Sequence, residues 1–203
     1  MVSSQIPPSR LVVTDLCRRF DWREIFGNDR PVELDLGAGD GGFAIAYAQQ
    51  HPEINLLAVE RLLGRVRKIE KRAARAGLEN VRVLRLEFGY TVRHLLPPGS
   101  ISIAHILFPD PWPKRRHWDR RLVQPDFVRD LAAALRSGGE FRFTTDHADY
   151  FETAQAAVAE ANVLERAPEW DWSLDPKTDF QQGFEAEGRA TNRARWIKQP
   201  NRP

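Results

Sequence analysis

An aspartate between two prolines stands directly ahead of a run of basic residues in the segment 108–121, FPDPWPKRRHWDRR. Pro109 and Pro111 restrict the backbone on either side of Asp110, so we expect a stiff loop that presents the carboxylate in one geometry. The run comprises Lys114, Arg115, Arg116, Arg120 and Arg121, with His117 and Trp118 among them. A fixed carboxylate beside aromatic and cationic side chains suits a base that is flipped out of a polyanion.

An alternative interpretation of this segment is a proline-rich turn followed by the exposed start of a basic helix. Basic residues at a helix N-terminus oppose the helix dipole, which weakens that alternative. The net charge of +2 does not by itself indicate a nucleic-acid partner. A second basic run, over 61–75, is equally compatible with the solvated face of a helix. We therefore expect the nucleic-acid contact at 108–121.

A glycine-rich loop provides the second group of residues that could do chemistry. Gly37, Gly39 and Gly42 fit the pattern G-x-G-x-x-G, which allows a tight turn and the close approach of a ligand to the backbone. Glu60 ends the next apolar run, where a carboxylate can accept hydrogen bonds from both hydroxyls of an adenosine ribose. The loop therefore predicts a cofactor that contains adenosine.

Two such cofactors fit the loop, NAD and S-adenosylmethionine. Asp35 and Asp40 flank the glycines, and carboxylates at these positions would repel a pyrophosphate but suit an ammonium or a sulfonium group. Glu87, at the end of a later apolar run, could accept a hydrogen bond from the adenine amino group. We expect S-adenosylmethionine. An NAD-dependent oxidoreductase stays an alternative, although it leaves 108–121 unexplained.

Strand-like and helix-like segments alternate around these residues. Apolar runs predict strands at 31–37, 55–60, 81–87, 101–108, 140–146 and 192–198. Helical spacing predicts helices at 42–50, 62–76, 120–136 and 147–161. This alternation indicates an α/β fold with a mostly parallel sheet that helices cover on both faces.

Acidic residues follow the predicted strands with unusual regularity. They are Asp35, Glu60, Glu87, Asp110 and Asp146. Any one of them could be a helix cap or a turn former. Ligands of parallel sheets bind at the carboxyl ends of the strands, however, so we expect these side chains to share one site.

Length and composition limit the class of protein. A chain of 203 residues with 42% hydrophobic and 29% charged residues suits a single folded domain without wholesale disorder. The chain contains no apolar run near the roughly 20 residues that span a bilayer, and its first residues do not follow the pattern of a secretory signal. Cys17 is the single cysteine, which predicts a cytoplasmic protein without disulfides. The histidines show no metal-ligand spacing, so we expect no metal.

The segment 108–121 resembles the signature of the bacterial tRNA (guanine-N7)-methyltransferases. WREIFGNDRPVELDLGAGDGGF (22–43) is similar to the lead-in and cofactor loop of that family, and FTTDHADYFE (143–152) also agrees. KTDFQQGFEAEGR (177–189) resembles its T-x-[FY]-E segment. The similarity extends over nearly the whole chain from about Asp21. We therefore expect a single methyltransferase domain over 21–203, preceded by a segment, 1–20, that need not be rigid.

The resemblance implies a Rossmann-like class I fold with a final antiparallel strand, and S-adenosylmethionine as the cofactor. Together with the glycine loop, it predicts cofactor binding by Asp35, Gly37, Gly39, Glu60, Glu87 and Asp110, with Asp110 as the catalytic position. Together with the basic run, it predicts substrate binding by Lys114, Arg115, Arg116, His117, Asp146, Thr178 and Gln181. The implied substrate is guanine 46 in the variable loop of tRNA, and the implied enzyme is a monomer or a homodimer.

The implied chemistry needs no strong general base, because guanine N7 carries a free lone pair. Methyl transfer moves positive charge from the sulfonium to the purine. Asp110 would orient the guanine and stabilise the developing charge, and Asp146 would assist from the end of its strand. Most of the acceleration would come from holding N7 in line with the methyl group.

Two positions depart from the family's pattern. Glu87 stands where an aspartate is more usual, which preserves the chemistry on a longer side chain. Gln181 stands where the family has a glutamate, and an amide offers one acceptor oxygen and adds donors. This difference puts guanine binding by Gln181 in doubt and leaves a non-catalytic tRNA-binding relative as an alternative.

Overall fold

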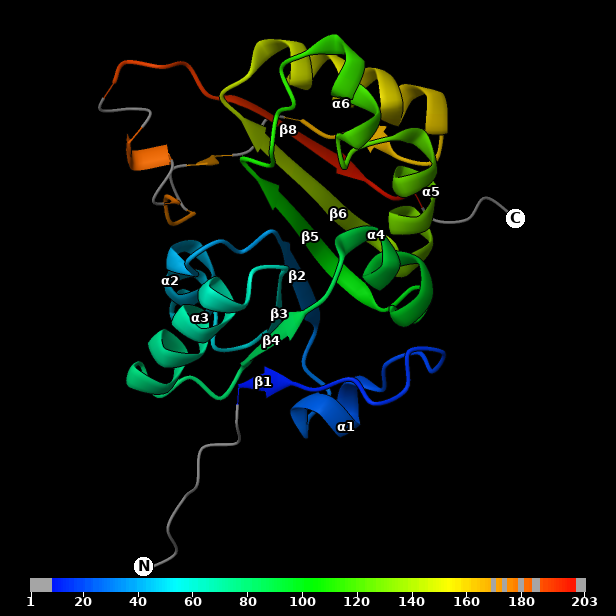
Figure 1. The fold of residues 1–203 in the computed structure, drawn as a ribbon. Coiled ribbons are helices and arrows are strands. Elements are labelled where there is room, and N and C mark those ends of the chain that lie inside the picture. The colour runs from blue at the N-terminus through cyan, green and yellow to red at the C-terminus, as the bar shows by residue number, and fades with distance from the viewer. Residues whose placement is uncertain (1–8, 169–170, 173–174, 179–180, 184–186, 200–203) are drawn as a thin grey trace, which may run out of the picture.

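One sheet connects the strands of this computed structural model, which describes residues 9–168, 171–172, 175–178, 181–183 and 187–199. Its order is β1-β4-β3-β2-β5-β6-β8-β7 (Figure 1). The strands are β1 (Arg10–Leu11), β2 (Val32–Leu36), β3 (Asn55–Glu60), β4 (Val81–Arg85), β5 (Ile101–Leu107), β6 (Leu135–Thr145), β7 (Glu165–Arg166) and β8 (Asn192–Ile197). Neighbours from β1 to β6 are parallel, whereas β8 is antiparallel to β6 and β7. The predicted sheet and its final antiparallel strand are confirmed.

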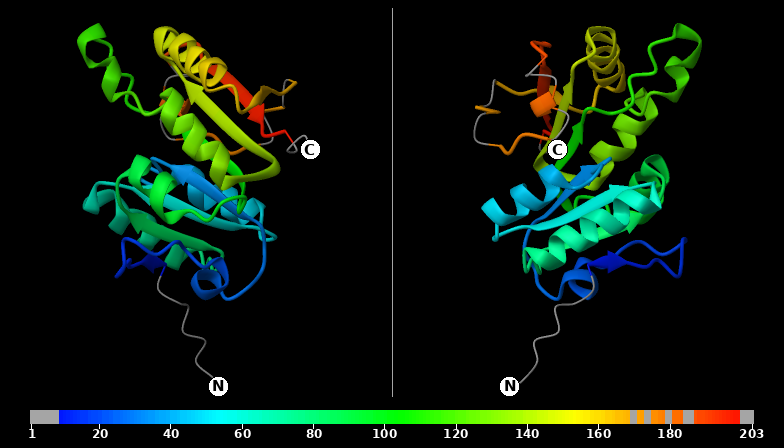
Figure 2. Two further views of the ribbon diagram at one scale, coloured as in Figure 1. Left: turned by 90° about the vertical axis from the view of Figure 1, so that its right-hand side faces the viewer. Right: turned by 60° about the vertical axis from the view of Figure 1, so that its left-hand side comes forward.

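Helices cover both faces of this sheet (Figures 1 and 2). They are α1 (Trp22–Phe26), α2 (Gly42–Gln50), α3 (Leu63–Arg75), α4 (Phe88–Tyr90), α5 (Pro125–Ala134) and α6 (Ala148–Ala161), with a π-helical turn η1 (Thr91–Leu95) and a 3₁₀ turn η2 (Arg115–Arg120). None of the helices in the described part of the chain is long and apolar enough to cross a bilayer.

The two faces hold separate hydrophobic clusters, because successive residues of a strand point to opposite sides. On β3, Leu56 and Ala58 pack with residues of α2 and α3, whereas Leu57 and Val59 belong to the cluster that includes α5 and α6. All four side chains are fully buried. A strand buried on both faces reads as a continuous apolar run, which is why β3 was predictable from the sequence.

The predicted helix over 120–136 is wrong at both ends. Residues 115–120 form η2, and Arg121 and Gln124 are extended, with ψ of 134° and 160°. Pro125 explains the late start of α5, because proline disfavours helical conformation in the residue before it and fits the first turn of a helix. Leu135 already begins β6, so this strand starts earlier than predicted.

Part of the predicted N-terminal segment packs on the domain. Arg10 and Leu11 form β1, which pairs with Val83 and Leu84 of β4, and Arg10 forms an ion pair with Glu70 of α3. Phe20 donates its backbone N–H to the Leu95 carbonyl at 2.8 Å. Residues 1–8 lie outside the described residues, so the division into a segment 1–20 and a domain 21–203 stays a prediction.

A substitution at Gly41 tests how tightly the start of α2 packs on α3. Gly41 has φ +82°, and a Cβ there would lie 2.8 Å from Ile69 Cγ1 in the fully buried core. We expect Gly41→Ala to lose about 1–2 kcal/mol from the left-handed backbone and roughly 1–3 kcal/mol more from overpacking. Urea unfolding measures the loss.

Gly77→Ala is the matched control for this substitution. Gly77 has φ +65°, but nothing lies within 4 Å of the place that a Cβ would occupy there. We therefore expect this variant to show the backbone cost alone. Equal losses in the two variants would contradict the close packing of the glycine loop on α3.

Candidate active site

The acids predicted from the sequence lie at the carboxyl edge of the sheet. Asp35 is the penultimate residue of β2, Glu60 ends β3, and Asp146 directly follows β6. Glu87 and Asp110 stand slightly farther out, in the connections after β4 and β5. β2 lies between β3 and β5 in the sheet, so the glycine loop that follows β2 lies between the ends of these two strands. This is the usual location for a ligand in such a sheet.

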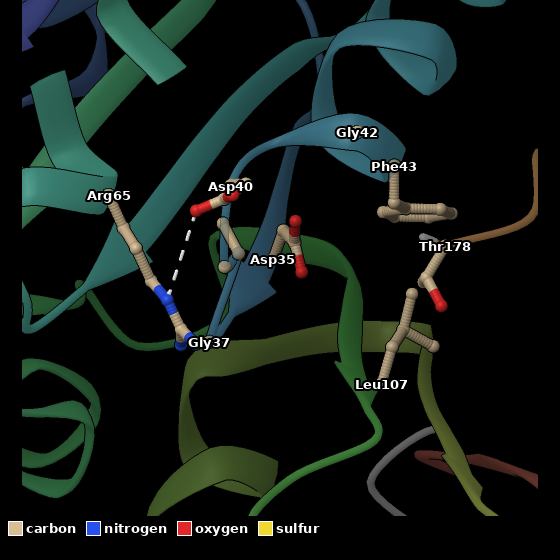
Figure 3. Close-up of a pocket in the computed structure, with 10 residues that line it drawn as sticks. Asp35, Gly37, Asp40, Gly42, Phe43, Arg65, Leu107 and Thr178 are labelled. Atoms are coloured by element: carbon tan, nitrogen blue, oxygen red, sulfur yellow. Dashed lines mark ion pairs between the residues drawn. The ribbon is translucent and has the colours of Figure 1, made fainter. Parts of the chain in front are cut away.

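A pocket of about 290 Å³ opens at this edge (Figure 3). Its lining consists of Asp35, Gly37, Ala38, Gly39, Asp40, Gly42, Phe43, Arg65, Leu107 and Thr178. The structure thus brings three of the predicted cofactor residues together with Thr178, which comes from the far C-terminal part of the chain. Among the described residues, Glu60, Glu87 and Asp110 do not belong to the lining.

Asp35 carries a buried carboxylate into this pocket. The residue is 2% exposed, and its Oδ2 atom has no hydrogen-bond partner among the described residues. Burial, and to a lesser degree the nearby charge of Glu60, raises the pKa of Asp35 to about 7. Such a group gains most from a ligand that brings positive charge or donors, because a buried unpaired carboxylate is costly.

Glu60 holds the glycine loop from behind. Its carboxylate accepts hydrogen bonds from the backbone N–H groups of Gly39 at 3.1 Å, Arg61 at 2.7 Å and Leu62 at 2.9 Å. The residue is 3% exposed. Glu60 therefore connects the end of β3 to the loop after β2, and ribose binding by its carboxylate stays a prediction.

Arg65 and Asp40 line the pocket. The sequence placed Asp40 beside the glycine loop, but the predicted set of site residues contains neither. Arg65 Nη1 lies 3.8 Å from Glu60 Oε2, and Arg65 Nε lies 3.9 Å from Asp40 Oδ1. Lys68 donates to Asp40 Oδ2 at 2.8 Å, and this hydrogen bond lowers the pKa of the Asp40 carboxyl. The basic run 61–75 was the sequence signal for these partners, and part of it faces the site rather than solvent alone.

Glu87 acts locally in this structure. Its carboxylate accepts from the backbone N–H groups of Gly89 at 2.9 Å and Tyr90 at 2.6 Å, and so caps α4. The side chain is exposed. An exposed cap at the end of β4 is compatible with an additional hydrogen bond to a ligand, and that role stays a prediction.

The loop that carries Asp110 has an unusual backbone. Phe108 and Trp112 have φ of +50° and +43°, although neither is glycine.

Asp110 is exposed, as are Lys114, Arg115, Arg116 and Arg120 of the basic run. Arg120 lies over the Trp112 ring at 5.1 Å and Arg115 over the Trp118 ring at 5.7 Å. The ring centroids of His117 and Trp112 are 6.0 Å apart. Arg116 Nε lies 3.3 Å from Nε2 of His117.

The predicted C-terminal site residues begin a helical turn. Thr178 Oγ1 accepts the backbone N–H of Gln181 at 2.9 Å, and residues 181–183 are helical. A threonine side chain accepts a backbone N–H in the same way at a helix N-cap. Gln181 is 7% exposed. Asp146, at the end of β6, forms an ion pair with Arg189.

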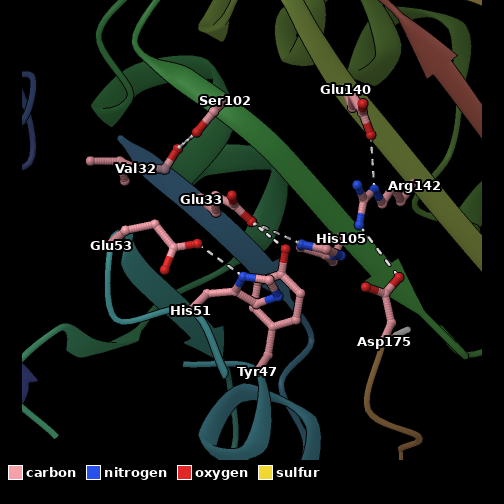
Figure 4. Close-up of polar contacts among 10 residues, drawn as sticks. All are labelled: Val32, Glu33, Tyr47, His51, Glu53, Ser102, His105, Glu140, Arg142 and Asp175. Carbon is pink, nitrogen blue, oxygen red and sulfur yellow. Dashed lines mark hydrogen bonds and ion pairs between the residues drawn. The ribbon is translucent and has the colours of Figure 1, made fainter. Parts of the chain in front are cut away.

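An ion pair on the sheet anchors this C-terminal segment (Figure 4). Arg142, on β6 and 3% exposed, lies 3.4 Å from Asp175 and 2.9 Å from Glu140. Asp175 stands only three residues ahead of Thr178 in the sequence. The contact therefore explains how a segment so distant in sequence reaches the pocket.

A buried polar cluster lies under the pocket floor. Tyr47 donates to Glu33 Oε2 at 2.9 Å, and His105 Nε2 lies 3.3 Å from the same oxygen (Figure 4). The rings of Tyr47 and His105 both contact Phe43, which lines the pocket. These contacts fix the position of Phe43. Within the described part of the chain, no group of three or more His, Cys, Asp or Glu side chains could hold a metal ion.

Comparisons with known proteins agree with this geometry. A family model described as "Putative methyltransferase" matches residues 29–199. A tRNA (guanine-N(7)-)-methyltransferase of Listeria monocytogenes is 33% identical over 172 residues, which cover 82% of this chain and 80% of that protein. A protein of the same name from Thermus thermophilus is 39% identical over 132 residues, which cover 65% of this chain but only 42% of that protein.

The crystal structure of the 16S rRNA methyltransferase KamB shares the fold, with a TM-score of 0.67 at 20% identity over 88% of this chain and 93% of that chain. The sheet order and its antiparallel last strand therefore define a Rossmann-like class I methyltransferase fold. Within that class, the chain belongs to the family of the bacterial tRNA (guanine-N7)-methyltransferases.

The raised pKa of Asp35 predicts a specific dependence of stability on pH. Between the ordinary value of 3.8 and about 7, the folded chain keeps a proton that the unfolded chain releases. The ligand-free protein therefore loses stability as the pH rises through this window. Asp35→Asn removes this titration. The melting temperature of the variant minus that of wild type should therefore increase by several degrees as the pH rises from about 5 to about 8.

Asp40→Asn is the control for this measurement. The pKa of Asp40 is lowered, so its stabilising contribution disappears only at acidic pH, below the window of Asp35. Its melting-temperature difference from wild type should stay flat over the same range. A flat difference for Asp35→Asn as well would contradict the raised pKa of Asp35.

Proposed function

We propose that the chain transfers the methyl group of S-adenosylmethionine to N7 of guanine 46 in the variable loop of tRNA. The observation that carries the proposal is that two features share one edge of the sheet: a pocket with the buried carboxylate of Asp35, whose Oδ2 has no hydrogen-bond partner among the described residues, and the cationic loop 108–121. The first feature suits a cationic cofactor, and the second suits a polyanionic substrate. Membership of the tRNA (guanine-N7)-methyltransferase family supports both assignments.

S-adenosylmethionine fits the donor set of the pocket. Asp35 would bind the ammonium group of its amino-acid part, and the backbone of Gly37 and Gly39 would surround that part. Glu60, Glu87 and Asp110 would contact the rest of the cofactor from the surrounding strand ends. Bound there, the cofactor supplies the methyl group. NAD suits the pocket less well, because its pyrophosphate would face the Asp35 carboxylate.

Asp110 would receive the guanine. Its exposure leaves the carboxylate free to accept N–H groups from a base that has left the stack, and its place between two prolines limits its movement. The positive charge that appears on the purine is stabilised by the carboxylate. Asp146 would assist across the end of β6, together with its partner Arg189.

The basic run would bind the tRNA backbone. Lys114, Arg115 and Arg116 are exposed and lie just beyond Asp110, where His117 could add a further contact. Thr178 would contact the substrate from the pocket rim. A tRNA substrate also supports a cytoplasmic enzyme, which would act as a monomer or a homodimer.

A non-catalytic tRNA-binding protein is the second candidate, because Gln181 replaces the family's glutamate. The structure weakens the reason for that candidate. Gln181 donates its backbone N–H to Thr178, a bond that does not depend on the side chain, and glutamine suits the third helical position as glutamate does. We therefore favour catalysis and expect the amide to alter side-chain contacts with the guanine at most.

Methylation of unmodified tRNA tests the proposal directly. Purified protein, S-adenosylmethionine and unmodified tRNA should yield 7-methylguanine in the variable loop, detected by nucleoside mass spectrometry and by chemical cleavage at the modified base. Asp110→Ala should reduce kcat by roughly 100-fold or more, because it removes the electrostatic stabilisation, while tRNA still binds.

Asp119→Ala is the matched control, since Asp119 is another exposed aspartate of the same loop. It should retain kcat within about twofold, as expected for a surface substitution. An equal loss of kcat and of tRNA affinity in Asp110→Ala would contradict the catalytic role. Tight tRNA binding without any methylation by wild type would favour the non-catalytic candidate.

Salt dependence of tRNA binding tests the role of the basic run. If Arg116 contacts a phosphate, Arg116→Ala should reduce the slope of log K against log salt concentration by about 1, because one fewer counterion is released. Arg129 is an exposed control on α5, paired with Asp126, and Arg129→Ala should leave the slope unchanged. Indistinguishable slopes for wild type and Arg116→Ala would remove Arg116 from the phosphate contacts.

A further inference from the structure

Arg121 differs from the other cations of the basic run because it is buried. It is 2% exposed, whereas Lys114, Arg115, Arg116 and Arg120 are exposed. Its side chain therefore cannot reach a phosphate of a bound polyanion from its present position. Arg121 needs an explanation other than electrostatic contact with tRNA.

The guanidinium of Arg121 joins two separate parts of the structure. Its Nε donates to the Pro111 carbonyl at 2.9 Å, in the loop after β5. Its Nη1 donates to Thr153 Oγ1 at 2.7 Å and to the Asp149 carbonyl at 3.2 Å, both in α6. The planar fork of an arginine can make these bonds at once, which a lysine ammonium on a flexible stem cannot reproduce.

Aromatic rings complete the environment of this cation. The Trp118 ring lies 4.4 Å from the guanidinium carbon and the Tyr150 ring 4.9 Å from it. No carboxylate among the described residues forms an ion pair with Arg121, so carbonyls, a hydroxyl and two ring faces stabilise the charge. Burial lowers the pKa of Arg121. A buried cation of this kind is costly to maintain, which points to a role beyond simple packing.

The part of the loop that Arg121 holds is strained and lies next to the catalytic position. Pro111 directly follows Asp110, and the non-glycine residues Phe108 and Trp112 on either side have positive φ. Such conformations persist only where surrounding contacts determine them. Thr153 and Asp149 belong to α6, which begins two residues after Asp146. The bonds of Arg121 therefore connect the backbone at Asp110 to the helix that follows Asp146.

We propose that Arg121 is a positioning residue that fixes Asp110 relative to Asp146 by clamping the loop 108–113 to α6. The role rests on the proposed function, in which Asp110 orients the guanine. The clamp itself is a property of the protein without substrate. It sets the distance across which a flipped guanine has to fit, so its loss should impair orientation of the base more than attraction of the tRNA.

Hydrogen exchange of the ligand-free protein tests the clamp without reference to activity. Arg121→Lys keeps the charge but loses the fork, and Thr153→Val removes one of its acceptors with little change of shape. We expect amides of 112–118 to exchange roughly tenfold faster in both variants, while amides of α2 keep their rates. Unchanged exchange at 112–118 in both variants would overturn the clamp, whether or not the protein methylates tRNA.

Single-turnover methylation then tests positioning. Arg121→Lys should lower the rate roughly 10- to 100-fold, while the Kd for tRNA and its salt slope stay at the wild-type values. Combined with Asp110→Asn, it should cause little further loss, because its effect operates through Asp110.

Fully additive losses would overturn positioning of Asp110, and a salt slope reduced by about 1 would identify Arg121 as a phosphate contact instead. Absence of methylation by wild type would overturn the proposed function, and the exchange experiment would still decide the clamp.

Discussion

The burial of ionisable side chains on one face of the sheet is the constraint on which the site depends. Asp35, His105, Arg142 and Arg195 share one register on β2, β5, β6 and β8, so their side chains point to the same face. Charges removed from water are costly unless other groups satisfy them. The C-terminal segment provides such a group, because Asp175 pairs with Arg142. The same contact holds the C-terminal segment over the sheet, and this places Thr178 at the pocket. One ion pair therefore both satisfies a buried charge and completes the lining of the pocket.

Asp35 and Glu60 show how two neighbouring buried carboxylates can do different work. Glu60 accepts three backbone N–H groups and thereby shapes the glycine loop, whereas one oxygen of Asp35 has no partner among the described residues. Contacts within the protein therefore hold the glycine loop in its conformation. The unsatisfied carboxylate is unfavourable when ionised and becomes favourable beside a cation, so the cofactor binding that we propose at Asp35 would be coupled to release of the Asp35 proton.

The sequence predicted six of the eight strands in the described part of the chain, all except the two-residue strands β1 and β7, and most of the strand-end acids. Fully buried strands are continuous apolar runs, and parallel sheets bind ligands at one edge. Prediction from the sequence failed for two reasons, a local signal that was not used and contacts between distant segments. The helix predicted over 120–136 ignored the effect of Pro125 on the residue before it, a local signal that could have been used. Nothing local distinguishes buried Arg121 from exposed Arg120, since the difference arises from Thr153 and the Tyr150 ring on another helix. The approach of Thr178 to the pocket depends likewise on Arg142, on a distant strand.

Gln181 illustrates how the fold limits the effect of a departure from the family's pattern. Thr178 begins a helical turn, and its side chain accepts the N–H of residue 181 whatever side chain that residue carries. The third position of such a turn suits glutamine as well as glutamate. Because Asp175 anchors the segment independently, the position of Thr178 at the pocket does not require a carboxylate at 181. In the substrate contact that we propose for Gln181, the amide would offer one acceptor oxygen where a glutamate offers two.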